Sequence, residues 1–404
     1  MNGLRTRGQP VAAAAIRAML GSGFPHAVLL TGPGGVGKTT LALDIAAALL
    51  CSGADPSERP CRDCRTCRMV EHGNHPDLHW LSPSGPGRLI SIGGRDERGV
   101  RELVRDLAYL PVEGGMRVAI VESAHRMTED AQTAFLKTLE EPPPRTTIVL
   151  SADEEERLLP TIHSRCVRIR LGPMGSRDIE AVLVAQGVAD APTASRLARI
   201  SDGRPGHAIA FARAPEAVVI RGEIARTLLD LLKGGVTARL TGLRDLAGRA
   251  AALTKALESG ARDSAATSTP GTRGWRKATA APVAAPPSDT AADGESPAVD
   301  PDGPGEGRPM KVPAAERRRA ALALLEIWRT LTRDLGLTIA QETGAIRDQD
   351  LLDDLVSSAA RLDLATIGAA LRRLDVAAER LEGNVSPELV LDVLALHWAP
   401  SRAA

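Results

Sequence analysis

A glycine-rich segment that ends in lysine and threonine is the first feature with clear chemical meaning. Residues 32–39 fit the pattern GxxxxGK[ST], between an apolar stretch expected to form a strand and an Ala- and Leu-rich stretch expected to form a helix over 38–50. Backbone N–H groups of such a loop can point at phosphate oxygens, while Lys38 can reach the β- and γ-phosphates and Thr39 can offer a hydroxyl to Mg²⁺. The alternative, a glycine-rich turn without a ligand, does not explain why motif and context agree. The sequence therefore predicts a site for ATP or ADP with Mg²⁺, built from Gly32, Pro33, Gly34, Gly35, Val36, Gly37, Lys38, Thr39 and Thr40.

Four of the five cysteines lie close together just after this predicted helix. Their spacing, C-x9-C-x2-C-x2-C, lets tight turns place the thiolates around one tetrahedral ion. Four thiolates fill the coordination shell of zinc, so the predicted role is structural. Two disulfides or unpaired thiols are the alternatives, and His72, His75 and His79 could compete as ligands. We favour a structural Zn²⁺ ion held by Cys51, Cys61, Cys64 and Cys67.

The composition narrows the class of protein. Hydrophobic residues make up 43% of the chain, and Lys plus Arg equal Asp plus Glu at 50 each, so the overall charge does not predict strong nucleic-acid binding. Aromatic residues are scarce, which argues against a surface for stacking bases. No apolar run approaches the roughly 20 residues needed to span a bilayer, and the start has no signal-peptide core. We therefore expect a cytoplasmic protein with no membrane partner, where clustered cysteines bind metal more readily than they form disulfides.

Strands and helices are expected to alternate over the first part of the chain. The apolar stretches predict strands at 26–31, 77–81, 117–121, 146–150 and 167–171, with helices at 38–50, 100–107 and from an N-cap at Thr128 to Glu140. This alternation predicts a doubly wound α/β fold with a parallel sheet flanked by helices. After Pro173 the strands stop and short helices follow. Residues 259–312 are poor in large apolar residues and are expected to be disordered, and helical periodicity resumes at Ala314.

Three motifs taken together resemble the clamp-loader branch of the AAA+ proteins. They are the phosphate loop with CxxCxxC after it, the stretch LKTLEEPP at 136–143, and the triplet Ser164-Arg165-Cys166. The match covers residues 7–210, and beyond 215 only domain order and helical character agree. The domains that the resemblance implies are an AAA+ P-loop module at 1–172 with a zinc insertion at 51–67, a helical lid at 173–214, an all-α C-terminal collar at 215–258 and 313–400, and a linker at 259–312.

Within this family, some subunits hydrolyse ATP, whereas the delta-prime type is a rigid end piece. A hydrolysing site needs a carboxylate after the third strand for Mg²⁺ and an adjacent Glu that orients the attacking water. Glu122 can serve the first role, but Ser123 stands at the second position, and a hydroxyl is no general base without an activator. Thr133 replaces the usual Asn, and His207 stands where motor subunits carry a phosphate-contacting Arg, for which Arg204 could substitute. We therefore expect Glu122 and His207 to border bound nucleotide, with weak or absent ATPase activity.

Arg165 receives its role from the resemblance. In the family, the arginine of the SRC triplet enters the nucleotide site of a neighbouring subunit and stabilises charge on the γ-phosphate. The alternative is a surface arginine before a strand. The implied partners are the gamma/tau and delta subunits of the bacterial DNA polymerase III clamp loader in a hetero-oligomer, and through it the sliding clamp and primed DNA. Ser123, Thr133 and His207 favour the delta-prime type of subunit. A gamma/tau motor of the same loader is the alternative function, and a P-loop nucleotide kinase is the alternative from another class.

Overall fold

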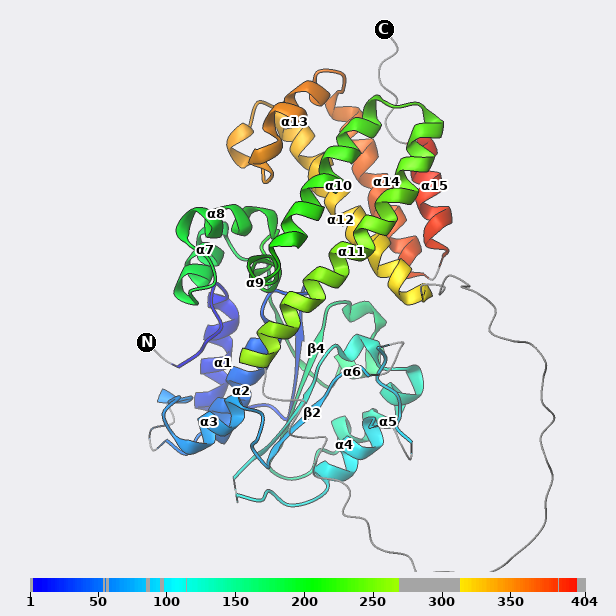
Figure 1. The fold of residues 1–404 in the computed structure, drawn as a ribbon. Helices are drawn as coiled ribbons and strands as arrows, with labels where there is room; N and C mark the ends of the chain where they lie inside the picture. The colour runs from blue at the N-terminus through cyan, green and yellow to red at the C-terminus, as the bar shows by residue number, and fades with distance from the viewer. Residues whose placement is uncertain are drawn as a thin grey trace, which may run out of the picture.

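The five strands expected from the sequence form one parallel sheet in a computed structural model of the chain (Figure 1). The structure describes residues 3–53, 55, 58–84, 88–94, 98–113, 115–268, 313–383 and 385–397. The strands are β1 (Ala27–Thr31), β2 (Leu78–Leu81), β3 (Arg117–Val121), β4 (Thr146–Ala152) and β5 (Val167–Arg170), in the order β2-β3-β4-β1-β5. Because β1 lies between β4 and β5, the segment that follows β1 is bordered by the segments that follow both neighbours.

Helices cover both faces of this sheet, as predicted. They are α1 (Pro10–Ser22), α2 (Lys38–Leu50), α3 (Arg65–Glu71), α4 (Val100–Leu107), α5 (Glu129–Glu140) and α6 (Pro160–His163). Alternate residues of a strand face opposite sides, and each side has its own hydrophobic core. Val28 and Leu30 of β1 pack with α1, α2 and α3, whereas Leu29 packs with α4, α5 and α6. The α/β prediction is confirmed.

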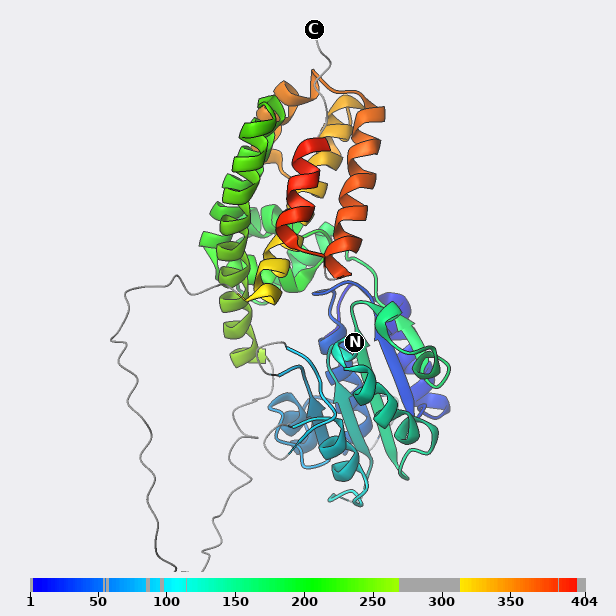
Figure 2. The ribbon, with the colours of Figure 1, turned by 90° about the vertical axis from the view of Figure 1, so that its right-hand side faces the viewer.

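The rest of the described chain is helical and packs as one body. The segment expected to form a lid, called the lid below, contains α7 (Ser176–Ala185), α8 (Ala191–Ile200) and α9 (Pro205–Arg213). The segment expected to form a collar, called the collar below, contains α10 (Pro215–Lys233), α11 (Val236–Ser268), α12 (Ala314–Ile339), α13 (Leu352–Ala359), α14 (Leu364–Glu382) and α15 (Pro387–His397). A single hydrophobic core includes Leu183 and Ala208 of the lid with Leu228 and Trp328 of the collar. Figures 1 and 2 show this helical body above the α/β module.

Some elements differ from the sequence-based expectation. Helices α1 and α3 were not predicted; α1 is rich in alanine and has Pro10 at its first position, and α3 is too short for a clear periodicity. Helix α11 continues past residue 258 to Ser268, and the remainder of the predicted linker lies outside the described residues.

Thr128 caps α5 as predicted, because its hydroxyl accepts the N–H of Ala131 at 3.3 Å. No described helix has both the length and the apolar character that crossing a bilayer requires.

A buried ion pair ties three parts of the collar together. Nη1 of Arg221 in α10 donates to Oδ2 of Asp348 at 2.6 Å, and the two side chains are 6% and 8% exposed. Asp334 of α12 accepts the backbone N–H groups of Arg347 and Asp348 at 3.1 and 3.3 Å. These contacts hold the segment before α13 against α10 and α12.

Replacing Asp348 by alanine should destabilise the helical body by about 3–5 kcal/mol, because Arg221 would keep a buried charge without its partner. Urea titration followed by circular dichroism measures the change. Asp350→Ala is the matched control, since Asp350 pairs with Arg196 across an exposed contact (54% and 51% exposed). It should cost less than about 1 kcal/mol. Equal losses in the two variants would contradict the assigned role of burial.

Candidate nucleotide site and metal centre

The phosphate loop joins the end of β1 to the start of α2, as the motif requires. Gly32 and Gly35 have φ angles of 138° and 80°, which L-residues rarely adopt. A Cβ on Gly32 would lie only 2.1 Å from the carbonyl oxygen of Leu171, so the segment after β5 leaves no room for a side chain there. Helix α2 begins at Lys38, and the N–H groups of its first turn carry partial positive charge. This backbone is suited to binding an anion such as phosphate.

The ammonium group of Lys38 is held by three acceptors. Nζ donates to the carbonyl oxygens of Gly32 at 2.6 Å and Pro33 at 2.7 Å, and it lies 2.7 Å from Oδ1 of Asp153. Asp153 directly follows β4, and β4 pairs with β1, so its carboxylate lies beside the loop. The sequence analysis missed Asp153. Its only signal was its position directly after an apolar stretch, which becomes informative once β4 is known to neighbour β1.

Glu122 and Thr39, both predicted to border nucleotide and Mg²⁺, are in direct contact. The Thr39 hydroxyl donates to Oε1 of Glu122 at 3.0 Å. Burial raises the pKa of Glu122, and hydrogen bonds from Thr39 and Trp80 oppose that rise. A hydroxyl and a carboxylate are oxygen ligands of the kind that Mg²⁺ prefers. The adjacent Ser123 has a left-handed conformation with φ 54°, and its N–H donates to Oγ of Ser151 at 3.1 Å.

The first turn of α9 lies directly on the phosphate loop. The N–H of Gly206 donates to the carbonyl oxygen of Gly35 at 2.9 Å, and a Cβ on Gly35 would lie 3.0 Å from the ring of His207. Burial, with a smaller contribution from Arg204, lowers the pKa of His207 to about 3, so this ring is neutral at pH 7. The guanidinium of Arg204 pairs with Glu326 of α12 and is therefore held by the collar. The idea that Arg204 substitutes for a phosphate-contacting arginine is not supported by this arrangement.

Arg165 lies at the opposite end of the strands from the phosphate loop, where their amino ends gather. It precedes β5, whereas the phosphate loop follows the parallel strand β1. A strand of four or five residues separates these edges by about 13–17 Å. The guanidinium pairs with Glu140 and donates to the carbonyl oxygen of Thr161 at 2.8 Å and to the Ser164 hydroxyl at 3.1 Å. Arg165 is thus placed by α5 and α6, apart from the phosphate loop of its own chain, and its side chain stays 30% exposed.

The four clustered cysteines converge at the C-terminal end of α2. Their Sγ atoms all lie within 4.8 Å of one another, and Sγ of Cys51 is 3.5 Å from that of Cys61 and 3.9 Å from that of Cys64. Four sulfurs around a tetrahedral Zn²⁺ ion would be separated by roughly 3.8 Å. None of the four forms a disulfide, and the N–H of Cys67 donates to Sγ of Cys64 at 3.3 Å. Donor set and spacing therefore fit zinc.

A buried carboxylate fastens the cysteine loop to α2. Asp44 of α2 accepts the N–H groups of Arg5 at 3.1 Å and Thr6 at 2.8 Å, and it pairs with the guanidinium of Arg62. Arg62 belongs to the loop between Cys61 and Cys64, and it also lies 3.2 Å from Glu71 of α3. The N-terminal segment, α2, α3 and the cysteine loop thus meet at Asp44, which the sequence analysis did not identify.

The histidines considered as alternative ligands do not join the cysteines. Within the described residues, the group able to hold a metal consists of the four cysteines. Nδ1 of His75 accepts the N–H of Asp77 at 3.1 Å, and burial lowers the pKa of His79 to about 4. Burial raises the pKa of Cys166 to about 12, so this thiol is a packed and unreactive one.

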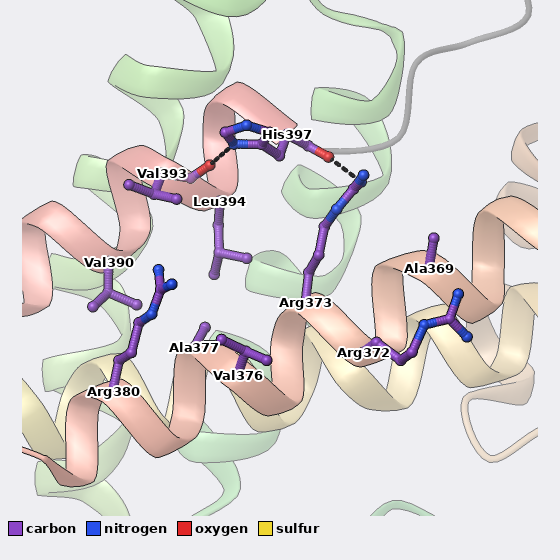
Figure 3. Close-up of a pocket in the computed structure, with 10 residues that line it drawn as sticks. All are labelled: Ala369, Arg372, Arg373, Val376, Ala377, Arg380, Val390, Val393, Leu394 and His397. Atoms are coloured by element: carbon purple, nitrogen blue, oxygen red, sulfur yellow. Dashed lines mark hydrogen bonds between the residues drawn. The ribbon is translucent and has the colours of Figure 1, made fainter.

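A cavity of about 440 Å³ lies between α14 and α15 in the collar (Figure 3). Its floor is apolar, and Arg372, Arg373 and Arg380 line it from α14. Arg373 donates to the carbonyl oxygen of His397 at 2.6 Å. No residue of the phosphate loop, the lid or the cysteine cluster lines this cavity, so it is separate from the nucleotide site.

Freshly purified protein should contain about one equivalent of zinc, and Cys64→Ser should lose most of it together with thermal stability, because a structural ion contributes folding free energy. Elemental analysis and thermal unfolding measure both effects. Cys166→Ser is the matched control and should keep its zinc. A zinc content below about half an equivalent in the unmodified protein would count against the site.

The sequence matches fall on the α/β module. Residues 9–175 match the family model described as "DNA polymerase III, delta subunit". DNA polymerase III subunit delta′ of Bacillus subtilis is 32% identical over 201 residues, which cover 50% of this chain and 58% of the relative. Subunit delta′ of Pseudomonas aeruginosa is 36% identical over 182 residues, covering 45% and 53%. Subunit gamma of Buchnera aphidicola is 33% identical over 154 residues, covering 38% and 40%. The chain spans about half the length of the delta′ relatives.

Solved structures align with this chain at low scores. The RuvB branch migration motor of Thermotoga maritima has a TM-score of 0.34 at 18% identity and covers 59% of this chain and 67% of that one. A gamma subunit-related protein from the same organism has a TM-score of 0.36 at 14% identity, covering 96% and 99%. The assignment rests on the sequence matches instead. The α/β module of this chain is thus similar in sequence to the delta′ and gamma subunits of DNA polymerase III clamp loaders.

Proposed function

We propose that this chain is the stator-like delta′ subunit of a DNA polymerase III clamp loader. It binds ATP or ADP with Mg²⁺, hydrolyses ATP weakly or not at all, and gives Arg165 to the nucleotide site of a neighbouring subunit. The observation that carries the proposal is the position of Arg165 before β5, at the opposite edge of the sheet from the phosphate loop.

Arg165 is suited to act on another molecule. A guanidinium stabilises the charge that develops on a γ-phosphate only when it reaches that phosphate. The phosphate loop of this chain lies at the other end of the strands, whereas the partly exposed side chain of Arg165 lies beside the outermost strand β5. Its partner Glu140 is 49% exposed, and such surface pairs contribute only about 0–1 kcal/mol. Exchanging Glu140 for a neighbour's phosphate therefore costs little.

Two features of the chain's own site support weak hydrolysis. Thr39 and Glu122 supply oxygen ligands for Mg²⁺, but Ser123 replaces the carboxylate that would orient an attacking water. His207 is neutral at pH 7 because its pKa is about 3, so it cannot supply the positive charge of a phosphate-contacting arginine. The site is therefore suited to holding nucleotide and poorly suited to cleaving it.

A gamma/tau motor is the second candidate. Relatives named gamma and tau are 31–34% identical to this chain, and the phosphate loop is intact. Ser123 and the neutral His207 favour the stator role over the motor role. In either role, the proposed partners are the gamma/tau and delta subunits in a hetero-oligomer, with the sliding clamp and primed DNA reached through the assembly in the cytoplasm.

Arg165→Ala should leave nucleotide binding by this chain unchanged and should lower the ATPase rate of the reconstituted loader. An arginine finger contributes about 10³-fold or more at the site it serves, so the neighbouring site should become nearly silent. Steady-state phosphate release measures the rate. Arg168→Ala, on the same edge strand and 59% exposed, is the control and should not change it. An unchanged rate with Arg165→Ala would refute the assignment.

The isolated chain should bind MgADP yet show little steady-state ATP hydrolysis, because Ser123 cannot act as a base at neutral pH. Calorimetric titration and a phosphate-release assay separate the two properties, and Lys38→Ala should lose binding. Turnover at an ordinary ATPase rate would favour the motor role instead.

A further inference from the structure

Asp153 is the charged group nearest to the ammonium of the phosphate loop. Its Oδ1 lies 2.7 Å from Nζ of Lys38, and a Cβ on Gly34 would lie 3.2 Å from its Oδ2. One carboxylate oxygen therefore contacts the lysine while the other lies against the backbone of the loop. Asp153 stands in the space over the loop into which an anion bound by Lys38 has to fit.

The contact uses the last donor of Lys38. An ammonium group has three N–H donors, and the carbonyl oxygens of Gly32 and Pro33 accept two of them. Asp153 completes the set. An incoming phosphate group can accept a hydrogen bond from Lys38 only by displacing one of these acceptors or by sharing the ammonium group with Asp153.

The backbone around Asp153 is itself fixed. The N–H of Asp153 donates to Nδ1 of His125 at 3.2 Å, and burial lowers the pKa of His125 to about 4, so the ring is a neutral acceptor at pH 7. Strand β4 holds the preceding residue, because Ala152 pairs with Thr31 at the end of β1. The carboxylate is thus placed by the sheet rather than by a free loop.

We propose that Asp153 sets the nucleotide preference of this site. Its carboxylate occupies the position beside Lys38 that a γ-phosphate would take, so a nucleoside diphosphate binds more tightly than a triphosphate. The inference rests on the proposed nucleotide binding and names its ligand class. A diphosphate can use the N–H groups of the loop and of α2, whereas a third phosphate brings more negative charge next to a carboxylate.

The size of the preference follows from the exposure of Asp153. Two anions a few ångströms apart repel strongly in a buried site, but the Asp153 side chain is 40% exposed and water screens it. We therefore expect MgADP to bind about ten-fold more tightly than MgATP, equivalent to about 1.4 kcal/mol. A neutral residue at position 153 should remove this difference chiefly by strengthening MgATP binding.

Calorimetric titration of the full-length chain with MgADP, MgATP and a β,γ-imido analogue of ATP tests the inference. Asp153→Asn keeps the shape of the side chain and removes its charge, and Asp153→Ser is a second neutral variant in case the first folds poorly. Glu154→Gln is the matched control, because Glu154 is the adjacent carboxylate and pairs with Arg157 instead of Lys38. The control should keep the preference of the unmodified chain.

The outcomes separate this inference from the proposed function. Tighter binding of MgADP that disappears with Asp153→Asn and persists with Glu154→Gln supports it. Equal binding of the two nucleotides by the unmodified chain, or a preference that Asp153→Asn leaves intact, overturns the inference while nucleotide binding stands. Absence of MgADP binding by both the unmodified chain and the neutral variants overturns nucleotide binding itself and the inference with it.

Discussion

All five strands of the sheet run in one direction, and the placement of the phosphate loop and of Arg165 depends on that constraint. Parallel strands send their carboxyl ends to one edge and their amino ends to the other. The phosphate loop, Glu122 and Asp153 follow strands and gather at the first edge, whereas Arg165 precedes a strand and lies at the second. The α/β module therefore carries the phosphate loop and Arg165 at opposite ends of its strands.

The lid contacts both the α/β module and the collar. Its α9 donates a hydrogen bond to the phosphate loop, and its other helices share a hydrophobic core with the collar. Arg204 and Asp202, at the start of α9, pair with Glu326 and Arg347 of the collar. A ligand that displaces α9 from the loop therefore has to move the packed helical body that α9 belongs to.

The sequence determined much of this structure through local signals. The strand at 117–121 and the helix at 38–50 were predicted with the correct bounds. A short apolar run and a motif with a fixed structural context are compatible with few secondary structures. Cysteine spacing likewise predicted a cluster that the fold does bring together. Alanine-rich α1 and short α3 lacked a clear period and were missed.

The groups that the sequence did not reveal depend on pairings between distant segments. Asp153 gains its meaning from the β1–β4 pair, and Asp44 from a loop and an N-terminal segment that fold back onto α2. The direction of Arg204 is set by Glu326, more than a hundred residues away along the chain. No pattern within a window of one helix or strand contains that information.

Helix α11 has a mechanical consequence. It is 33 residues long, about 50 Å, and in Figure 1 it runs from the collar down to the α/β module. Along the way Gly260 packs against Ala210 of α9, and Glu258 lies 3.3 Å from Arg88 of the module. Because this helix contacts both bodies, holding the collar in place also fixes the orientation of the sheet. Contacts at the far end of the molecule would then set the direction in which Arg165 faces.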